Sequence, residues 1–526
     1  MAVTEAAPHA VVTGTDTTDD TAPRGGLANL LGTVDHLTIG RLYLASSLLL
    51  LVLGRVAGIL VDVERIDTGT TTVLDEFLGP AFSAHQVIDL FLFLVPAFVG
   101  LAIAIVPLQV GASTVAFPRA AAASFWTWLL SSGVVIASYF IDGGPPGLGT
   151  DTDGILLWTV GMGGAVAALL MATVCVLTTV LALRTAGMTV DRVPLFTWGS
   201  FVAGAVWLVS LPVLVAALVL TYVDVQYDAG LGAASHLGWA FGAPQVFAFA
   251  LPVLGLLLDV APVAAGARLR SRGTLLVLVA LAGMLSFGAE LVVADESVYQ
   301  DALYVGAAFA LLVPVLAVGG GMADTLRRGR LRPIAPLVLA VSAFLLLLAG
   351  VAANALRVID NLDLVGTSAD AAVRELAVVA GIAGVAGAAQ YWATKLFGAQ
   401  LKPAGGVFVA LLLVAGGLAM GVADVWSGFL DQPDGVATAA SVRDGVEALN
   451  TVAVVGGVLV LVGVLLLLVN LAVGRGGGDD AEGEVPADPW DGQTLEWATS
   501  SPPVPGGPGP LDPVTSATPL LDRKEA

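Results

Sequence analysis

The sequence has little cysteine, little histidine and little charge. Its 526 residues include one cysteine, Cys175, and four histidines, and only 12% of them are Asp, Glu, Lys or Arg, against about a quarter in soluble globular proteins. One cysteine excludes a disulfide framework, a structural zinc site and a thiolate-bound iron–sulfur cluster, because each needs several thiols. The scarcity of charge, together with 57% hydrophobic residues, excludes a soluble enzyme and a disordered scaffold.

The charge that is present is mostly negative. There are 22 basic and 42 acidic residues, which give a net charge of −20, and this balance excludes nucleic acid as a partner. The mean hydropathy of +0.90 is that of a protein surrounded mainly by lipid. Membrane lipid is therefore the first expected partner.

Long apolar runs predict an all-α integral membrane protein. A helix needs about 20 apolar residues to cross about 30 Å of hydrocarbon, and twelve runs are that long. The predicted spans are 40–62, 82–108, 124–142, 155–183, 196–223, 238–262, 273–294, 302–322, 333–356, 371–394, 404–425 and 450–474. Most of the 22 basic residues fall on the side of the two termini, so both termini are predicted to be cytoplasmic.

The ends of the chain differ in composition from the apolar middle. Residues 476–526 carry nine of the 27 prolines and ten of the 42 acidic residues, a composition that does not bury a core. We predict a disordered N-terminal arm at 1–35, a membrane domain at 36–475 and a disordered Pro/Gly/acidic tail at 476–526. The polar arm has no basic segment typical of a cleaved signal peptide.

Local motifs narrow the choice among membrane proteins. They are DHLTIGRLY at 35–43, FSAH at 82–85, VPLQVGA at 106–112, AFPR at 116–119, GGP at 143–145 and HLGWAFGAPQVF at 236–247. In order and spacing they resemble subunit I of the heme-copper oxidases, the cytochrome c oxidase family. The resemblance implies a twelve-helix bundle in the plasma membrane of a prokaryote, within a respiratory complex of other oxidase-type subunits.

The copper ligands implied by the resemblance are missing. The family binds copper through three histidines, and the aligned positions here are Ala243, Ala289 and Glu290. Copper of this type needs imidazole ligands, and alanine has no lone pair. The family's tyrosine beside the first ligand is Phe247. We expect no copper.

Most of the heme ligands are missing as well. The two hemes need three axial histidines, two of which align with Ala372 and Arg374. Arginine does not deprotonate to bind iron, so we expect no high-spin heme. His85 alone survives, at the position of a low-spin heme ligand. It is either a residual heme ligand or a histidine kept for packing and hydrogen bonding.

Charged residues lie within the predicted spans. They are Asp89, Asp259, Glu290, Arg374 and Glu375. Ionisable groups in a span cost at least about 2.5–3.5 kcal/mol unless they pair or meet water. One interpretation is an ion-pair cluster centred on Arg374, with Glu290 and Asp89 as its partners, in the space vacated by porphyrin. The alternative is that these charges lie nearer the helix ends or only stabilise packing.

Three functions remain open. The preferred one is a degenerate oxidase subunit without cofactors, which acts as a non-catalytic structural or regulatory partner of other oxidase-type subunits. The second is a divergent terminal oxidase that holds heme through His85. The third is a proton or ion pathway built on the buried acids.

Overall fold

The computed structural model describes residues 26–66, 78–289, 298–435, 444–475, 485–504 and 512–525. The chain forms two units, residues 1–33 and 34–526. The first unit contains the short helix α1 (Gly26–Leu31). All other described elements belong to the second unit and are helical, with no named β-strand in the described ranges.

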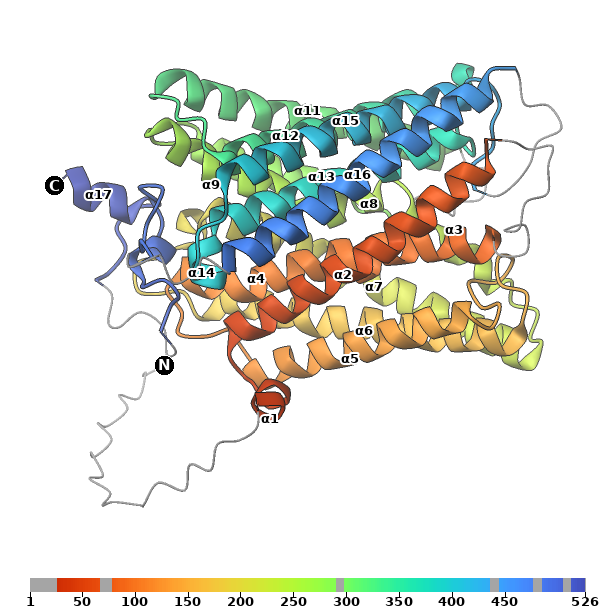
Figure 1. Cartoon of the computed structure of the whole chain (residues 1–526), viewed down its shortest axis with the longest axis horizontal. Helices are drawn as coiled ribbons and strands as arrows, with labels where there is room; N and C mark the ends of the chain where they lie inside the picture. Colours follow the sequence, from red (N-terminus) through yellow and green to blue (C-terminus); the bar gives the residue numbers. More distant parts are fainter. Residues whose placement is uncertain are drawn as a thin grey trace. The chain divides into compact units, whose positions relative to one another are not determined.

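The second unit is a bundle of long apolar helices (Figure 1). Eleven spans within the described residues are long and apolar enough to cross a membrane. They are α2 (His36–Glu64), α3 (Leu78–Val87) continued by η2 (Ile88–Leu94) and α4 (Val95–Val110), α5 (Pro118–Tyr139), α6 (Thr152–Ala182), α7 (Leu195–Tyr227), α8 (Gln245–Ala250) continued by α9 (Pro252–Ala265), α11 (Val298–Arg328), α12 (Ala335–Arg357), α13 (Ser368–Tyr391), α15 (Pro403–Gly428) and α16 (Val446–Arg475).

Shorter helices connect or follow these spans. They are η3 (Val190–Arg192), η4 (Ala233–His236), η5 (Gly238–Phe241), α10 (Arg272–Leu285), η6 (Asp360–Leu362), α14 (Ala393–Phe397), η7 (Leu495–Ala498) and α17 (Pro519–Glu525). Helix α10 occupies the first half of the seventh predicted span, 273–294. At 14 residues it is too short to count as a span, and residues 290–297 lie outside the described part of the chain.

Three spans form the interior. The most apolar stretches of Leu78–Val110, Gln245–Ala265 and Ser368–Tyr391 are buried completely, whereas the corresponding stretches of α5 and α11 are only 33% and 28% buried. These interior spans are the second, sixth and tenth of the predicted set. Of the positions that the resemblance assigns to metal ligands, His85, Ala372 and Arg374 lie on these interior spans.

The prediction of a disordered tail at 476–526 is wrong for the tail residues that the structure describes. Leu495, Glu496, Trp497 and Val514 are buried, and the tail packs at the end of the bundle where α16 finishes and α2 starts (Figure 1). The tail's average composition is polar, but its few aromatic and aliphatic residues are concentrated where they contact the helices. Local clustering, not the average, decides whether a segment can bury itself.

Candidate functional site

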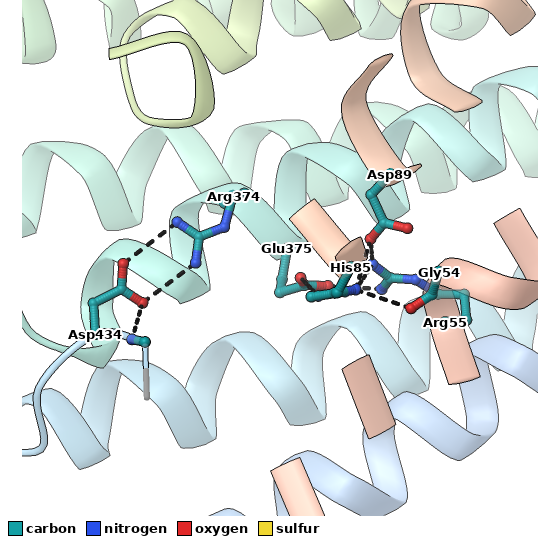
Figure 2. A network of polar contacts seen from close by, with 8 residues as sticks. Gly54, Arg55, His85, Asp89, Arg374, Glu375 and Asp434 are labelled. Atoms are coloured by element: carbon teal, nitrogen blue, oxygen red, sulfur yellow. Dashed lines mark hydrogen bonds and ion pairs between the residues drawn. The ribbon is translucent and has the colours of Figure 1, made fainter. Parts of the chain in front are cut away.

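Four charged or ionisable side chains meet in the interior, between α2, the α3–η2 segment and α13 (Figure 2). Arg55 Nη1 lies 2.7 Å from Glu375 Oε2, and the Nη2 atom of the same guanidinium pairs with Asp89. His85 Nε2 lies 2.7 Å from Glu375 Oε1. All four side chains are buried. We call this set of four residues the Arg55 network.

Glycines on α2 make room for the network. A Cβ atom at Gly58 would lie 2.6 Å from His85 Cε1, and one at Gly54 would lie 2.6 Å from Asp89 Oδ1, both too close for any side chain. His85 and Asp89 are four residues apart, so both face α2. The Gly54 carbonyl oxygen lies 3.1 Å from His85 Nδ1. Both ring nitrogens of His85 therefore have protein partners.

The buried carboxylates of the network share one guanidinium. The Arg55 guanidinium faces two carboxylates, those of Asp89 and Glu375, and the His85 ring also lies beside both acids, with Nδ1 3.3 Å from Asp89 Oδ2. Buried charges are tolerated where they are paired and hydrogen-bonded. The network therefore joins three spans through buried ion pairs. Each of these charged groups would be costly to bury without its partner.

Arg374 lies outside this network. Its Nη2 atom is 3.3 Å from Asp434 Oδ1, and the guanidinium packs 5.9 Å from the ring centre of Phe82. Arg374 is charge-paired, as predicted, but the prediction of Asp89 as its partner is wrong, because Asp89 pairs with Arg55. The other predicted partner, Glu290, lies outside the described residues.

The predicted single cluster centred on Arg374 is also wrong. Successive residues of a helix point about 100° apart, so Arg374 and Glu375 reach different partners from adjacent positions (Figure 2). Glu375 points into the bundle toward Arg55. Arg374 points toward Asp434, which follows the end of α15.

Arg374 and Asp434 border a cavity of about 630 Å³. Arg357, Asp370 and Ala243 also line it, and Arg357 pairs with Asp370. The cavity thus reaches Ala243, which the resemblance assigns to a copper-ligand position, and it carries charged groups of both signs. Ala289 and Ala372, two further aligned positions, are fully buried.

Asp259 has a separate, structural environment. Its carboxylate accepts hydrogen bonds from the backbone N–H groups of Leu195 and Phe196, at 2.8 and 2.9 Å, where α7 begins. Such a carboxylate satisfies otherwise unpaired donors and favours the helix N-terminus electrostatically. Gln109 donates a further bond at 3.1 Å. Asp259 is therefore not part of an Arg374 cluster.

Sequence reasoning missed three important residues. Arg55 lies seven residues before the end of the first predicted span, well inside it, whereas Arg41 stands at its start; a basic residue at this depth indicates a buried partner. Asp434 and Glu496 gave weaker signals, because they lie in a loop and in a tail of acidic composition. Glu496 stands between Leu495 and Trp497, and this apolar flanking is its one local indication of burial.

Comparison with known proteins identifies the fold. Residues 38–459 match the family described as Cytochrome C and Quinol oxidase polypeptide I. A Streptomyces avermitilis protein named as subunit 1-beta of cytochrome c oxidase is 30% identical, over 97% of this chain and 95% of the relative. Cytochrome c oxidase subunit 1 of Bacillus subtilis is 27% identical, over 91% of this chain and 80% of that protein.

A solved structure agrees with these relatives. A heme-copper terminal oxidase dimer determined by cryo-electron microscopy superposes with a TM-score of 0.63, over 83% of this chain and 84% of that chain, at 15% identity. At this identity the likeness shows the fold alone. The sequence match and the shared fold lead to one conclusion: the chain is a multi-pass membrane protein that belongs to the Cytochrome C and Quinol oxidase polypeptide I family.

Proposed function

We propose that this protein is a non-catalytic member of its family, without copper and without heme, which serves as a structural or regulatory partner of a respiratory complex in a bacterial plasma membrane. The observation that carries the proposal is the pairing of His85 Nε2 with Glu375 Oε1 at 2.7 Å. The one retained heme-ligand position is engaged by a carboxylate of the same chain.

The residues around His85 do not fit an axially ligated heme. An imidazole binds iron through a ring nitrogen with a free lone pair, and both nitrogens here lie within hydrogen-bonding distance of protein atoms. The Arg55 guanidinium occupies the adjacent space. The aligned partner position is Arg374, which pairs with Asp434 and has no lone pair to offer.

The residues at the aligned copper positions do not fit a copper ion either. Ala243 and Ala289 carry no ligand atom, and Glu290 lies outside the described residues. The nearby Gln245 side chain is engaged as well. Its Nε2 donates to Ser210 Oγ at 3.0 Å, and its Oε1 accepts from the Gly288 N–H at 3.2 Å.

The Arg55 network supplies a structural reason why the bundle tolerates the proposed loss of heme. It connects α2, the α3–η2 segment and α13 through buried ion pairs. These ion pairs hold the three spans together, while a cavity of about 630 Å³ remains beside Arg374 and Ala243. A subunit that keeps its fold also keeps its outer surfaces, and those are what a partner subunit contacts.

The other two functions have less support. Asp89 and Glu375 are paired with Arg55, and Asp259 is held by the backbone of α7, so pairing and capping account for these acids without a proton or ion pathway. A divergent oxidase would have to exchange the bond between His85 and Glu375 for an iron bond.

Absorption spectroscopy of the full-length protein, purified from its native membrane in mild detergent, tests the proposal. We expect no Soret band, before or after addition of hemin and removal of the excess. A His85→Ala variant is the matched control for nonspecific heme. A stoichiometric Soret band in the unaltered protein that disappears in His85→Ala would overturn the proposal in favour of a heme-binding oxidase.

A further inference from the structure

A second buried polar site lies where the C-terminal tail meets the bundle. Residues 490–500, which we call the plug, are anchored by hydrogen bonds to α13 and α14. Trp490 Nε1 donates to the Tyr391 carbonyl oxygen at 2.9 Å, and Lys395 Nζ donates to the Thr499 carbonyl oxygen at 2.6 Å. The Trp497 ring packs edge-on against Tyr391, with ring centres 5.0 Å apart. The plug is therefore a docked segment.

The plug inserts a carboxyl group into the bundle. Glu496 is fully buried, and its Oε1 accepts hydrogen bonds from Gln109 Nε2 at 3.0 Å and from Trp392 Nε1 at 3.3 Å. Its Oε2 has no hydrogen-bond partner among the described residues. Gln109 Nε2 also donates to Asp259 at 3.1 Å, so two carboxyl groups share one amide nitrogen.

Of the ionisable groups around Glu496, Asp259 disfavours its ionised form, whereas the Lys395 ammonium favours it. Asp259 faces it from α9, Tyr391 from α13 and Lys395 from α14. Lys395 directs its Nζ to the carbonyl oxygens of Thr499 and Ser500. The charged groups of α17 are engaged elsewhere: Asp522 and Glu525 with Arg268, Arg523 with Asp512, and Lys524 with Asp488 and Asp491.

These features give the carboxyl group an unusual affinity for a proton. Burial, followed by the charge of Asp259, raises the pKa of Glu496 to about 7. A glutamate in water titrates near 4.3. Burial lowers the pKa of the Lys395 ammonium to about 8, so this cation keeps its charge over the range in which Glu496 ionises.

We propose that the plug is a pH-sensitive closure of this end of the bundle, docked while Glu496 is protonated and released when Glu496 ionises. Its release would expose Gln109, Asp259 and Trp392 to water. This role is independent of whether the protein binds heme, because the plug contacts neither His85 nor the rest of the Arg55 network in the described structure.

The direction of the pH dependence follows from proton linkage. The docked state holds its proton up to about pH 7, and the released state loses it near the ordinary value for glutamate. Docking is therefore strongest below the ordinary value and weakens as pH rises to about 7, by up to tenfold per pH unit. Across this window we expect the docking equilibrium to fall on the order of 100-fold.

Hydrogen exchange of the full-length protein measures docking directly. We expect the amides of the plug to be protected at about pH 5 and to exchange much faster at about pH 7.5, after correction for the intrinsic pH dependence of exchange. Glu496→Gln keeps the shape and removes the charge, so its plug should stay protected at both pH values. Asp512→Asn alters a tail residue whose side chain is 93% exposed and should behave like the unaltered protein.

Two results would overturn the proposal. One is corrected protection of the plug that is equal at both pH values in the unaltered protein. The other is an unchanged pH dependence in Glu496→Gln. Limited proteolysis within 490–500 at the same pH values gives a second readout if exchange is too fast to follow.

Discussion

Arg55 and Glu375 are 320 residues apart in the sequence, yet Nη1 of the arginine lies 2.7 Å from Oε2 of the glutamate in the interior of the bundle. Glu375 also holds His85 Nε2 at 2.7 Å. The Glu375 carboxylate, on the tenth span, thus links the first span, which carries Arg55, to the second span, which carries His85. The retained histidine is best understood as a member of this charge network.

Arg55→Met should destabilise the protein strongly. The change leaves the carboxylates of Asp89 and Glu375 buried without their cation, and breaking a buried pair costs roughly 3–5 kcal/mol. Thermal unfolding in detergent checks this. The matched control is Arg327→Met, because that side chain is 83% exposed and its loss should change stability by no more than about 0.5 kcal/mol. Equal melting temperatures for the two variants would contradict the expectation.

Arg374→Leu should also lower thermal stability, by less than Arg55→Met. The side chain of Asp434 is 23% exposed, so water compensates part of the lost pairing, and we expect a cost of about 1–3 kcal/mol. Adding Asp434→Asn to Arg374→Leu should recover part of the loss, because it removes the carboxylate left without its cation. A double variant less stable than Arg374→Leu alone would show that the pair does not act in this way.

Metal analysis should find no stoichiometric copper in the washed protein, because Ala243 and Ala289 offer no ligand atom. Pyridine hemochrome assay of the same sample should find no heme. The heme-copper terminal oxidase whose structure resembles this chain, prepared in the same way, is the positive control. One copper per chain would refute the proposed loss of the copper site.

Purification from native membranes in mild detergent should recover this protein together with other oxidase-type subunits. The expectation rests on the family match over residues 38–459, which covers nearly the whole helical bundle. Mass spectrometry of a single size-exclusion peak, with and without crosslinking before solubilisation, is the measurement. Recovery only as a free monomer at native expression would count against a role in a complex.

The broad architecture was predictable from the sequence because it depends on local composition. Runs of about 20 apolar residues predict spans wherever they occur, and the described helices follow most of the predicted ranges. The seventh predicted span, 273–294, is the exception: its described residues form a helix of 14 residues, Arg272–Leu285, and its last five residues lie outside the described part of the chain. The motifs also predicted the family, because they record residue order and spacing directly.

The composition of the tail did not predict that parts of it dock against the bundle. An average over residues 476–526 is dominated by proline, glycine and acidic residues, while docking depends on a few side chains, such as Trp490 and Trp497, that find matching partners on the bundle. Those partners are more than 90 residues earlier in the chain. No property of the tail alone reports their presence.

The sequence by itself determined that this is a membrane-embedded helical protein of the oxidase subunit I family, and the proposed correspondence of Ala243, Ala289 and Arg374 to the family's metal ligands rests on the sequence alone. Only the tertiary structure decided how the buried charges pair. Asp89 meets Arg55, Glu375 meets Arg55 and His85, and Arg374 meets Asp434. The physical reason is that ion pairs form over a few ångströms between helices far apart in the sequence. Their partners follow from helix rotation and depth in the bundle, which hydrophobic patterning leaves open.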